Sequence, residues 1–220
     1  MVLRFSLGLA GVAAMLFLTA GSIRFWQGWV FLGVIFITGI SSTLYFYKHD
    51  PQLIERRLQS KEKVSEQKLL ISLWKPAFLA AFLLPGLDYR FGWSRAALGP
   101  MPVWLELLFQ AMVLSGYLFV VWVLKVNSFA SRTIQVEAGQ KVISSGPYSI
   151  VRHPMYLGAV IMCLSAPLAL GSYVALPVFA LTILFWVFRL LNEEKILREE
   201  LPGYVEYCRQ TTYRLVPFVW

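Results

Sequence analysis

Long apolar segments alternate with short polar ones along this chain of 220 residues. A helix needs about 20 mostly apolar residues to cross the roughly 30 Å of hydrocarbon in a bilayer. Four segments have about this length and carry at most one formal charge each: 5–23, 25–47, 69–87 and 103–124. The pattern predicts four membrane-spanning helices in the first 125 residues.

The apolar segment at 153–188 is longer and contains no Asp, Glu, Lys or Arg. As one straight helix it would measure about 54 Å, at about 1.5 Å per residue, which exceeds the thickness of a bilayer. Gly171 and Ser172 predict a reversal, with Pro167 and Pro177 bending the arms, because a Gly-Ser pair and proline both interrupt helices. We therefore expect a hairpin of two short spans over 154–190. The fold class is then all-α: a polytopic membrane helical bundle of about six spans.

The polar segment 50–68 mixes Leu53, Ile54, Leu58 and Val64 with basic side chains. This mixture fits an amphipathic helix lying on the headgroups, and an ordinary solvated connector fits it equally well. On these patterns we assign 1–125 to an N-terminal transmembrane scaffold. Residues 126–220 form a second region that contains the hairpin and a polar tail.

The distribution of basic residues predicts the orientation of the bundle. With six spans, 16 of the 20 Lys and Arg fall on one side. Basic residues concentrate in cytoplasmic loops, so both termini are expected in the cytoplasm. A cleaved secretory signal at the N-terminus is the weaker alternative, because the first apolar segment is longer than a usual signal core.

Composition narrows the class of protein further. Hydrophobic residues make up 58% of the chain and charged ones 15%, which is far from an average soluble domain. The net charge of +8 needs no nucleic-acid partner, since positive-inside bias and contact with anionic membrane lipids account for it. Cys163 in the hairpin and Cys208 in the tail do not suggest a disulfide framework. No metal site is expected, because the histidines and cysteines lack ligand spacing.

Two polar clusters, 140–156 and 189–194, flank the hairpin. A hairpin brings its two ends together, so we expect the clusters to meet in space. Arg189 and Glu193 are four residues apart and share a face of a predicted helix over 189–200. Ionisable groups at a membrane boundary are functional candidates, although this pair could also be an interfacial salt bridge. Arg152 is expected to shape the loop or to contact lipid phosphate rather than to catalyse.

A resemblance to a known family follows from three elements in order. They are GPYSIVRHPMYLG at 146–158, the predicted hairpin, and R-x-x-x-E-E at 189–194 followed by L-P-G-Y-x-x-Y at 201–207. This series resembles the isoprenylcysteine carboxyl methyltransferase family, which is related to the phospholipid methyltransferases. The resemblance covers roughly the last 95 residues and implies an S-adenosylmethionine site outside any Rossmann fold. The chain has no G-x-G-x-x-G.

The resemblance also implies which residues form the site, in the region 126–220. The family carries a histidine where this chain has Gln140, and the choice between Glu193 and Glu194 stays open, with the spacing from Arg189 favouring Glu193. Carried over position by position, the cofactor-binding residues are Gln140, Lys141, Val142, Ile143, Tyr148, His153, Pro154, Met155, Tyr156 and Glu193. Arg189 would bind the acceptor and act as the catalytic residue, because a guanidinium binds a carboxylate in bidentate fashion.

The implied reaction is carboxyl O-methylation of a lipophilic or prenylated acceptor. A carboxylate is anionic at neutral pH and needs no general base, so alignment in a dry pocket can supply much of the rate. N-methylation of a lipid amine or S-methylation of a small thiol are alternatives, and each would require a base. A non-catalytic transporter or assembly protein is a further alternative, although transporters usually carry charged or broken helices near the bilayer midplane.

Overall fold

A computed structural model of the chain describes residues 2–58, 65–130, 136–137 and 139–220. These residues form helices and contain no strand, which confirms the predicted all-α class. The elements in order are α1 (Val2–Ala20), α2 (Trp26–His49), α3 (Pro51–Leu58), α4 (Ser65–Phe91), α5 (Trp93–Leu98), α6 (Val103–Val126), η1 (Gly146–Ser149), α7 (Pro154–Ala169), α8 (Leu176–Glu200) and α9 (Tyr204–Gln210).

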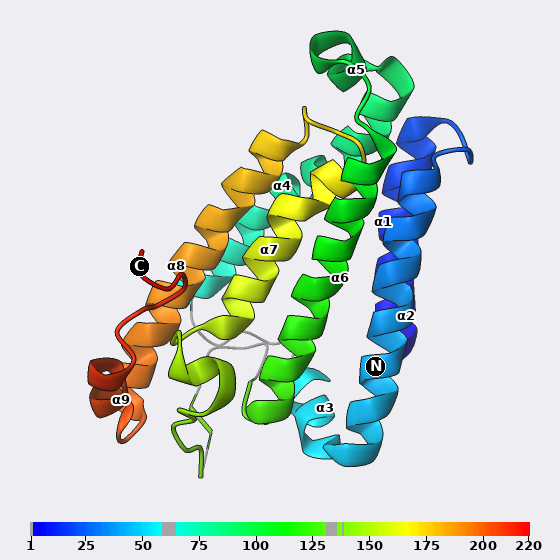
Figure 1. Cartoon of the computed structure of the whole chain (residues 1–220). Helices are drawn as coiled ribbons and strands as arrows, with labels where there is room; N and C mark the ends of the chain where they lie inside the picture. Colours follow the sequence, from blue (N-terminus) through cyan, green and yellow to red (C-terminus); the bar gives the residue numbers. More distant parts are fainter. Residues whose placement is uncertain (1, 59–64, 131–135, 138) are drawn as a thin grey trace.

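Among the described residues, five helices are long and apolar enough to cross a membrane: α1, α2, the part of α4 from Leu70 to Phe91, α6 and α8. Helix α7 is apolar but has only 16 residues. The six helices run alternately up and down in one bundle (Figure 1). This arrangement confirms a polytopic membrane bundle with a C-terminal hairpin. The predicted helix over 189–200 continues the second arm without a break, so α8 has 25 residues and is not a short arm.

The bundle has two ends, which we name after their short helices. The α3 end carries α3, η1 and α9, and the α5 end carries α5 and the turn between α7 and α8 (Figure 1). The predicted reversal at Gly171 is confirmed, and this residue has a φ of 73°, which glycine adopts without strain. Gly203 likewise has a φ of 83° and separates α8 from α9.

Buried Asp88 fixes the hairpin turn at the α5 end. Its Oδ1 accepts from the backbone N of Ser94 at 2.7 Å, and its Oδ2 accepts from the hydroxyls of Ser94 and Ser172. The hydroxyl oxygen of Ser94 accepts from the backbone N of Tyr173 at 2.8 Å and of Val174 at 3.1 Å. Since these bonds satisfy the buried carboxylate, they tie the turn to the end of α4 and the start of α5.

Helices α6 and α7 cross at a pair of glycines. A Cβ added at Gly158 would lie 2.6 Å from Cγ2 of Val120 and 3.1 Å from the carbonyl of Gly116. Small residues permit such close backbone approach in lipid, where no hydrophobic effect drives helices together. The crossing holds the start of the hairpin against the scaffold.

Helix α3 is docked on the bundle. Leu53 is fully buried and Ile54 nearly so, and both pack with Phe46 of α2 and Leu124 of α6. The apolar side of α3 therefore faces protein, while Val64, from the same predicted segment, lies outside the described residues. The division of the chain near residue 125 stays a prediction.

Candidate active site

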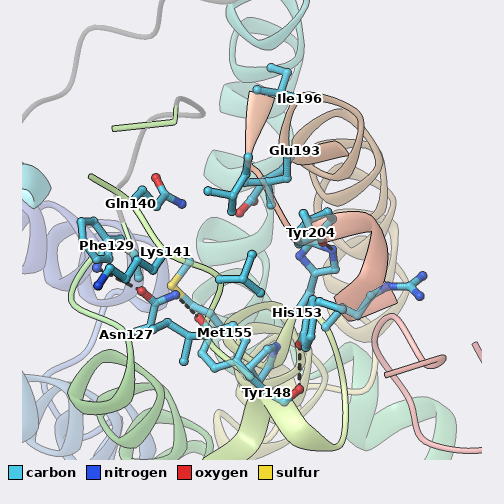
Figure 2. Close-up of a pocket in the computed structure, with 18 of the residues that line it drawn as sticks. Asn127, Phe129, Gln140, Lys141, Tyr148, His153, Met155, Glu193, Ile196 and Tyr204 are labelled. Atoms are coloured by element: carbon cyan, nitrogen blue, oxygen red, sulfur yellow. Dashed lines mark hydrogen bonds between the residues drawn. The ribbon is translucent and has the colours of Figure 1, made fainter. Parts of the chain in front are cut away.

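A cavity opens at the α3 end, between the chain that follows α6 and the start of the hairpin (Figure 2). The space that its residues enclose is about 840 Å³ when the part open to solvent is included. Every site residue nominated from the sequence lines it. The two polar clusters therefore meet in space, as the hairpin predicted.

The start of α7 and the middle of α8 meet at a tyrosine and a glutamate. The Tyr156 hydroxyl donates to Oε2 of Glu193 at 2.5 Å, and Tyr156 is almost fully buried. Arg189 lies one turn before Glu193 on α8, lines the same cavity and is also buried. A cation, an anion and a phenol thus share one wall of the cavity.

Tyr148 of η1 lies at the cavity wall formed by the preceding loop. Its hydroxyl accepts from Nδ2 of Asn127 at 2.9 Å, and its backbone carbonyl accepts from the hydroxyls of Tyr207 at 2.7 Å and Thr211 at 3.3 Å. Burial raises the pKa of Tyr148 to about 12, with a smaller contribution from the negative charge of Glu193. Tyr148 therefore presents a neutral phenol at physiological pH.

His153 precedes α7 and is buried, with its Nε2 3.4 Å from the hydroxyl of Tyr204. Burial lowers the pKa of His153 to about 3, and the positive charges of Arg152 and Arg214 add to this effect while Glu194 opposes it. The ring is thus neutral near pH 7. Its low basicity makes it a poor general base, because an efficient base has a pKa near the working pH.

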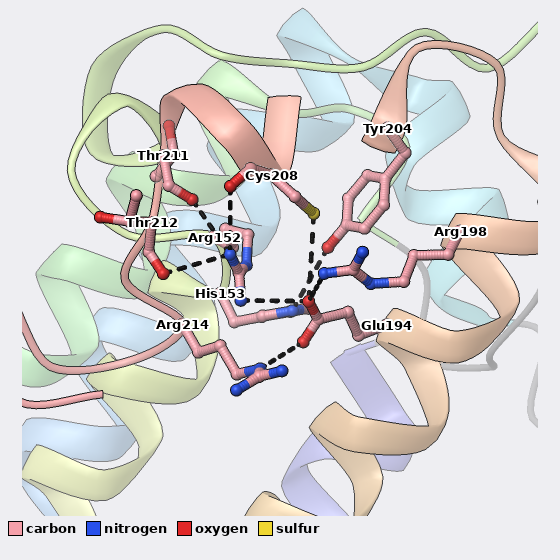
Figure 3. A network of polar contacts seen from close by, with 9 residues as sticks. All are labelled: Arg152, His153, Glu194, Arg198, Tyr204, Cys208, Thr211, Thr212 and Arg214. Carbon is pink, nitrogen blue, oxygen red and sulfur yellow. Dashed lines mark hydrogen bonds and ion pairs between the residues drawn. The ribbon is translucent and has the colours of Figure 1, made fainter. Parts of the chain in front are cut away.

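Glu194 lies in a network of polar contacts that borders the cavity (Figure 3). This buried carboxylate makes ion pairs with Arg152 at 3.1 Å, with Arg198 at 2.7 Å and with Arg214 at 2.7 Å. Glu194 is not among the residues that line the cavity, whereas Glu193 is. Of the two carboxylates, Glu193 is therefore the one that lies at the cavity surface.

Arg152 connects this network to the tail. Its Nη1 donates to the carbonyls of Thr211 at 3.1 Å and Thr212 at 3.2 Å, as Figure 3 shows. The backbone N atoms of Arg152 and His153 donate to the carbonyls of Tyr213 and Arg214, each at 2.9 Å. Arg152 is thus a buried structural residue that holds the tail across the mouth of the hairpin, in line with the shaping role expected for it.

Sequence reasoning missed part of the cavity wall. The signal for Leu201, Tyr204 and Tyr207 was present in the L-P-G-Y-x-x-Y element, whose residues were used for the resemblance but not assigned to the site. No pattern marked the residues that follow α6. The additional lining residues are Asn127, Phe129, Ala130, Arg152, Ile196, Leu197, Leu201, Tyr204 and Tyr207.

Gln140 contributes mainly to the shape of the loop. Its Oε1 accepts from the backbone N of Glu137 at 3.0 Å, and its own backbone N donates to the carbonyl of Glu137 at 3.0 Å. This reciprocal pair closes a turn. The neighbouring residues Lys141, Val142 and Ile143 then run along the cavity wall.

The cavity wall carries side chains of the kinds that could bind S-adenosylmethionine. Glu193 can pair with an ammonium or with ribose hydroxyls, and the tyrosine rings offer faces suited to a sulfonium cation. Apolar side chains from α8, Ile196 and Leu197, complete the wall. The residues present therefore fit this cofactor in charge and aromatic character.

Comparison with known proteins supports this interpretation. The family model PEMT, described as phospholipid methyltransferase, matches residues 107–202, somewhat less than half of the chain. That segment holds most of α6, η1 and both arms of the hairpin. The match supports a membrane methyltransferase-like function and a multi-pass membrane protein related to this family. It does not single out the isoprenylcysteine enzymes.

The chain is also similar to Delta(14)-sterol reductase TM7SF2 of Mus musculus. The two are 33% identical over 93 residues, which cover 40% of this chain and 22% of the relative. The chain therefore spans about a fifth of the length of that reductase. Both comparisons are confined to part of the chain.

Proposed function

We propose that this protein is an integral membrane methyltransferase that uses S-adenosylmethionine and acts on a lipophilic acceptor. Carboxyl O-methylation of an isoprenylcysteine-like acceptor is the first choice. The observation that carries the proposal is the single cavity that Tyr148, His153, Tyr156, Arg189 and Glu193 line together, although they come from separate segments of the chain.

In this proposal, the donor side of the cavity is the wall that contains Glu193. S-adenosylmethionine, when bound, supplies an electrophilic methyl group on a positively charged sulfur. Glu193 binds the amino group or ribose hydroxyls, and Tyr156 orients Glu193 through its hydrogen bond. The segment 140–143, together with Tyr148, His153, Pro154 and Met155, completes the proposed donor site.

Arg189 is proposed to bind the acceptor carboxylate. A buried guanidinium in a low-dielectric cavity orients a carboxylate through paired hydrogen bonds. The carboxylate already carries the attacking electron pair, so the reaction removes no proton. The neutral His153 ring supports this choice, since a reaction that needs a base would find a poor one there. Alignment and exclusion of water are then the main contributions of the protein.

We propose that the α3 end faces the cytoplasm and that both termini lie on that side. The polar segments at this end carry most of the basic residues, as the positive-inside rule requires. The donor then reaches the cavity from water, and a hydrophobic acceptor reaches it from the bilayer.

Two other candidate functions are each favoured by one comparison, and two more remain from the sequence analysis. The match to phospholipid methyltransferases favours N-methylation of a lipid amine, and S-methylation of a small thiol has the same demand for a base. The similarity to a sterol reductase favours a reduction at the same cavity. Such a reaction needs a hydride donor, and NADPH is the probe for one. A non-catalytic membrane protein would bind neither donor.

Two measurements test the proposal. Isothermal titration of the purified protein in detergent with S-adenosylhomocysteine and with NADPH identifies the donor. Radiolabelled methyl transfer is then compared for a prenylcysteine, phosphatidylethanolamine and a small thiol. We expect binding of S-adenosylhomocysteine and labelling of the prenylcysteine. Well-folded protein that does not bind S-adenosylhomocysteine would remove the methyltransferase proposal, and labelling of the amine alone would replace the acceptor.

A further inference from the structure

We infer that helix α3 of the scaffold is a positioning element for the donor site, through Arg56 and Arg57. This inference rests on the proposed function, because it concerns the affinity of the same cavity for its donor. Neither arginine lines the cavity. Both arginines contact residues that line it: Arg56 contacts Phe129, and Arg57 contacts Ala130 and Met155.

Arg56 binds the chain that follows α6 at several points. Its Nε donates to Oε2 of Glu137 at 2.7 Å, and its Nη1 donates to the carbonyl of Ser128 at 2.9 Å. The guanidinium carbon also lies 4.7 Å from the centre of the Phe129 ring. One side chain thus engages an anion, a carbonyl and an aromatic face, which is a combination that lysine cannot reproduce.

Arg57 binds the next residues along the cavity wall. Its Nη1 donates to the carbonyl of Ala130 at 3.2 Å and lies 3.9 Å from the sulfur of Met155. Ala130 and Met155 both line the cavity, and so does Phe129. The two arginines therefore contact the wall from outside, on the loop side and on the α7 side.

Helix α3 is itself fixed against the bundle, so its arginines can hold the cavity wall in place. Leu53 and Ile54 are buried against α2 and α6, and the Asp50 carboxylate accepts from the backbone N of Leu53 at 3.0 Å. Ala130 and Met155 pack against the same apolar cluster. A rigid support behind a binding wall reduces the ordering that a ligand must impose.

The wall itself has little regular structure to fix it. Between Asn127 and Ser145, the described residues form no helix or strand. Local bonds exist, such as the Asn127 carboxamide oxygen accepting from the backbone N of Phe129 at 3.0 Å, and the turn between Glu137 and Gln140. Val136 and Val142 pack against the cluster around Tyr204 and Tyr207, and the contacts from α3 tie the segment to the scaffold.

The Arg56 and Glu137 side chains are 17% and 19% exposed, so their charges are partly shielded from water. Hydrogen bonds to charged groups in such places contribute more than exposed surface pairs. Loss of this pair should let the wall move and should weaken donor binding by about tenfold, which corresponds to ~1.4 kcal/mol.

The test compares titrations of S-adenosylhomocysteine into wild-type protein and variants of both partners. We expect Arg56→Gln and Glu137→Gln to weaken binding to a similar extent, Arg56→Lys to rescue it only in part, and the double variant to be no weaker than either single variant. Glu55→Gln is the matched control, because Glu55 is exposed on the same helix. The melting temperature without ligand should change little, and the KM for the acceptor should not change.

The outcomes separate this inference from the proposed function. If wild-type protein binds S-adenosylhomocysteine and both single variants bind it equally well, the role of α3 is wrong and the function stands. Should Arg56→Gln fail to fold, Glu137→Gln decides the same question. If wild-type protein binds NADPH instead, the function is wrong and the same comparison with NADPH still decides the role of Arg56. Protein that binds neither overturns both.

Discussion

Glu193 and Glu194 are adjacent on α8, but their side chains lie in different environments. Glu193 lines the cavity and accepts from the Tyr156 hydroxyl, whereas Glu194 is buried among Arg152, Arg198 and Arg214. Adjacent helix residues point about 100° apart, so one faces the cavity and the other faces the tail. Their substitution should therefore affect different properties.

Glu193→Gln should weaken binding of S-adenosylhomocysteine by at least about tenfold, because the donor loses a charged partner worth ~1.5–3 kcal/mol. The melting temperature should stay close to the wild-type value, since the amide can still accept from Tyr156. Isothermal titration and thermal unfolding in detergent measure the two effects. Unchanged affinity would contradict the assignment of Glu193 to the donor.

Glu194→Gln should have the opposite profile. Removing one partner of a buried ion pair costs about 3–5 kcal/mol, and here three arginines lose their shared carboxylate. We expect the melting temperature to fall by roughly 6–20 °C for a chain of this size. Donor affinity measured well below the new melting temperature should change less than in Glu193→Gln. A wild-type melting temperature would contradict the structural role of this network.

Arg189→Gln should spare donor binding and lose methyl transfer. The guanidinium lines the cavity beside Glu193, and its proposed partner is the acceptor carboxylate. Losing oriented binding should lower kcat/KM by about 10²-fold or more. Arg189→Lys should recover part of it, because lysine keeps the charge but not the paired geometry. Equal loss of donor affinity in Arg189→Gln would move Arg189 to the donor side.

His153 should make the folded state less stable at mildly acidic pH. Burial lowers its pKa to about 3, whereas an unfolded histidine has a pKa of about 6.5. Between these values only the unfolded state binds the proton, so stability falls as pH falls, by up to ~1.4 kcal/mol per pH unit. His153→Gln should reduce the slope of melting temperature between pH 6.5 and 5. His49→Gln, at an exposed position, is the control; equal slopes in wild type and His153→Gln would refute the prediction.

Gly158→Ala should destabilise the bundle. The added methyl group would lie 2.6 Å from Cγ2 of Val120 and 3.1 Å from the Gly116 carbonyl, so α6 and α7 must move apart. Overpacking of this kind costs about 1–3 kcal/mol. Gly33→Ala is the matched control, because nothing lies within 4 Å of a Cβ at that helical position. That control should be neutral or slightly stabilising, and thermal unfolding in detergent measures both variants.

The spans and the reversal could be predicted because bilayer thickness sets the length of an apolar helix. The uncharged run at 153–188 had to fold back, and Gly171 marked the place. Once the hairpin was expected, its ends had to be neighbours, so the meeting of Tyr148 with Glu193 at one cavity followed from topology. The functional roles of these residues stay predictions.

Contacts between distant segments could not be predicted. Many glycines precede residue 40, but a Cβ at Gly8 or Gly11 would meet nothing within 4 Å, whereas Gly116 and Gly158 form the tight crossing. A glycine in the sequence does not reveal which helix will pack against it. The same limit applies to Arg56, whose partner Glu137 lies 81 residues away. The sequence around the crossing glycines and around Arg56 contains no pattern that indicates their contact partners.

The α7–α8 hairpin is fastened at both extremities. Asp88 grips the turn through Ser94 and Ser172, and the backbone of Arg152 and His153 is bonded to Tyr213 and Arg214 across the open side. The two arms cannot splay like a hinge without breaking one of these closures. For the lipophilic acceptor of the proposed function, we then expect entry by rotation of side chains between the arms and their neighbours, while the hairpin itself stays a fixed frame.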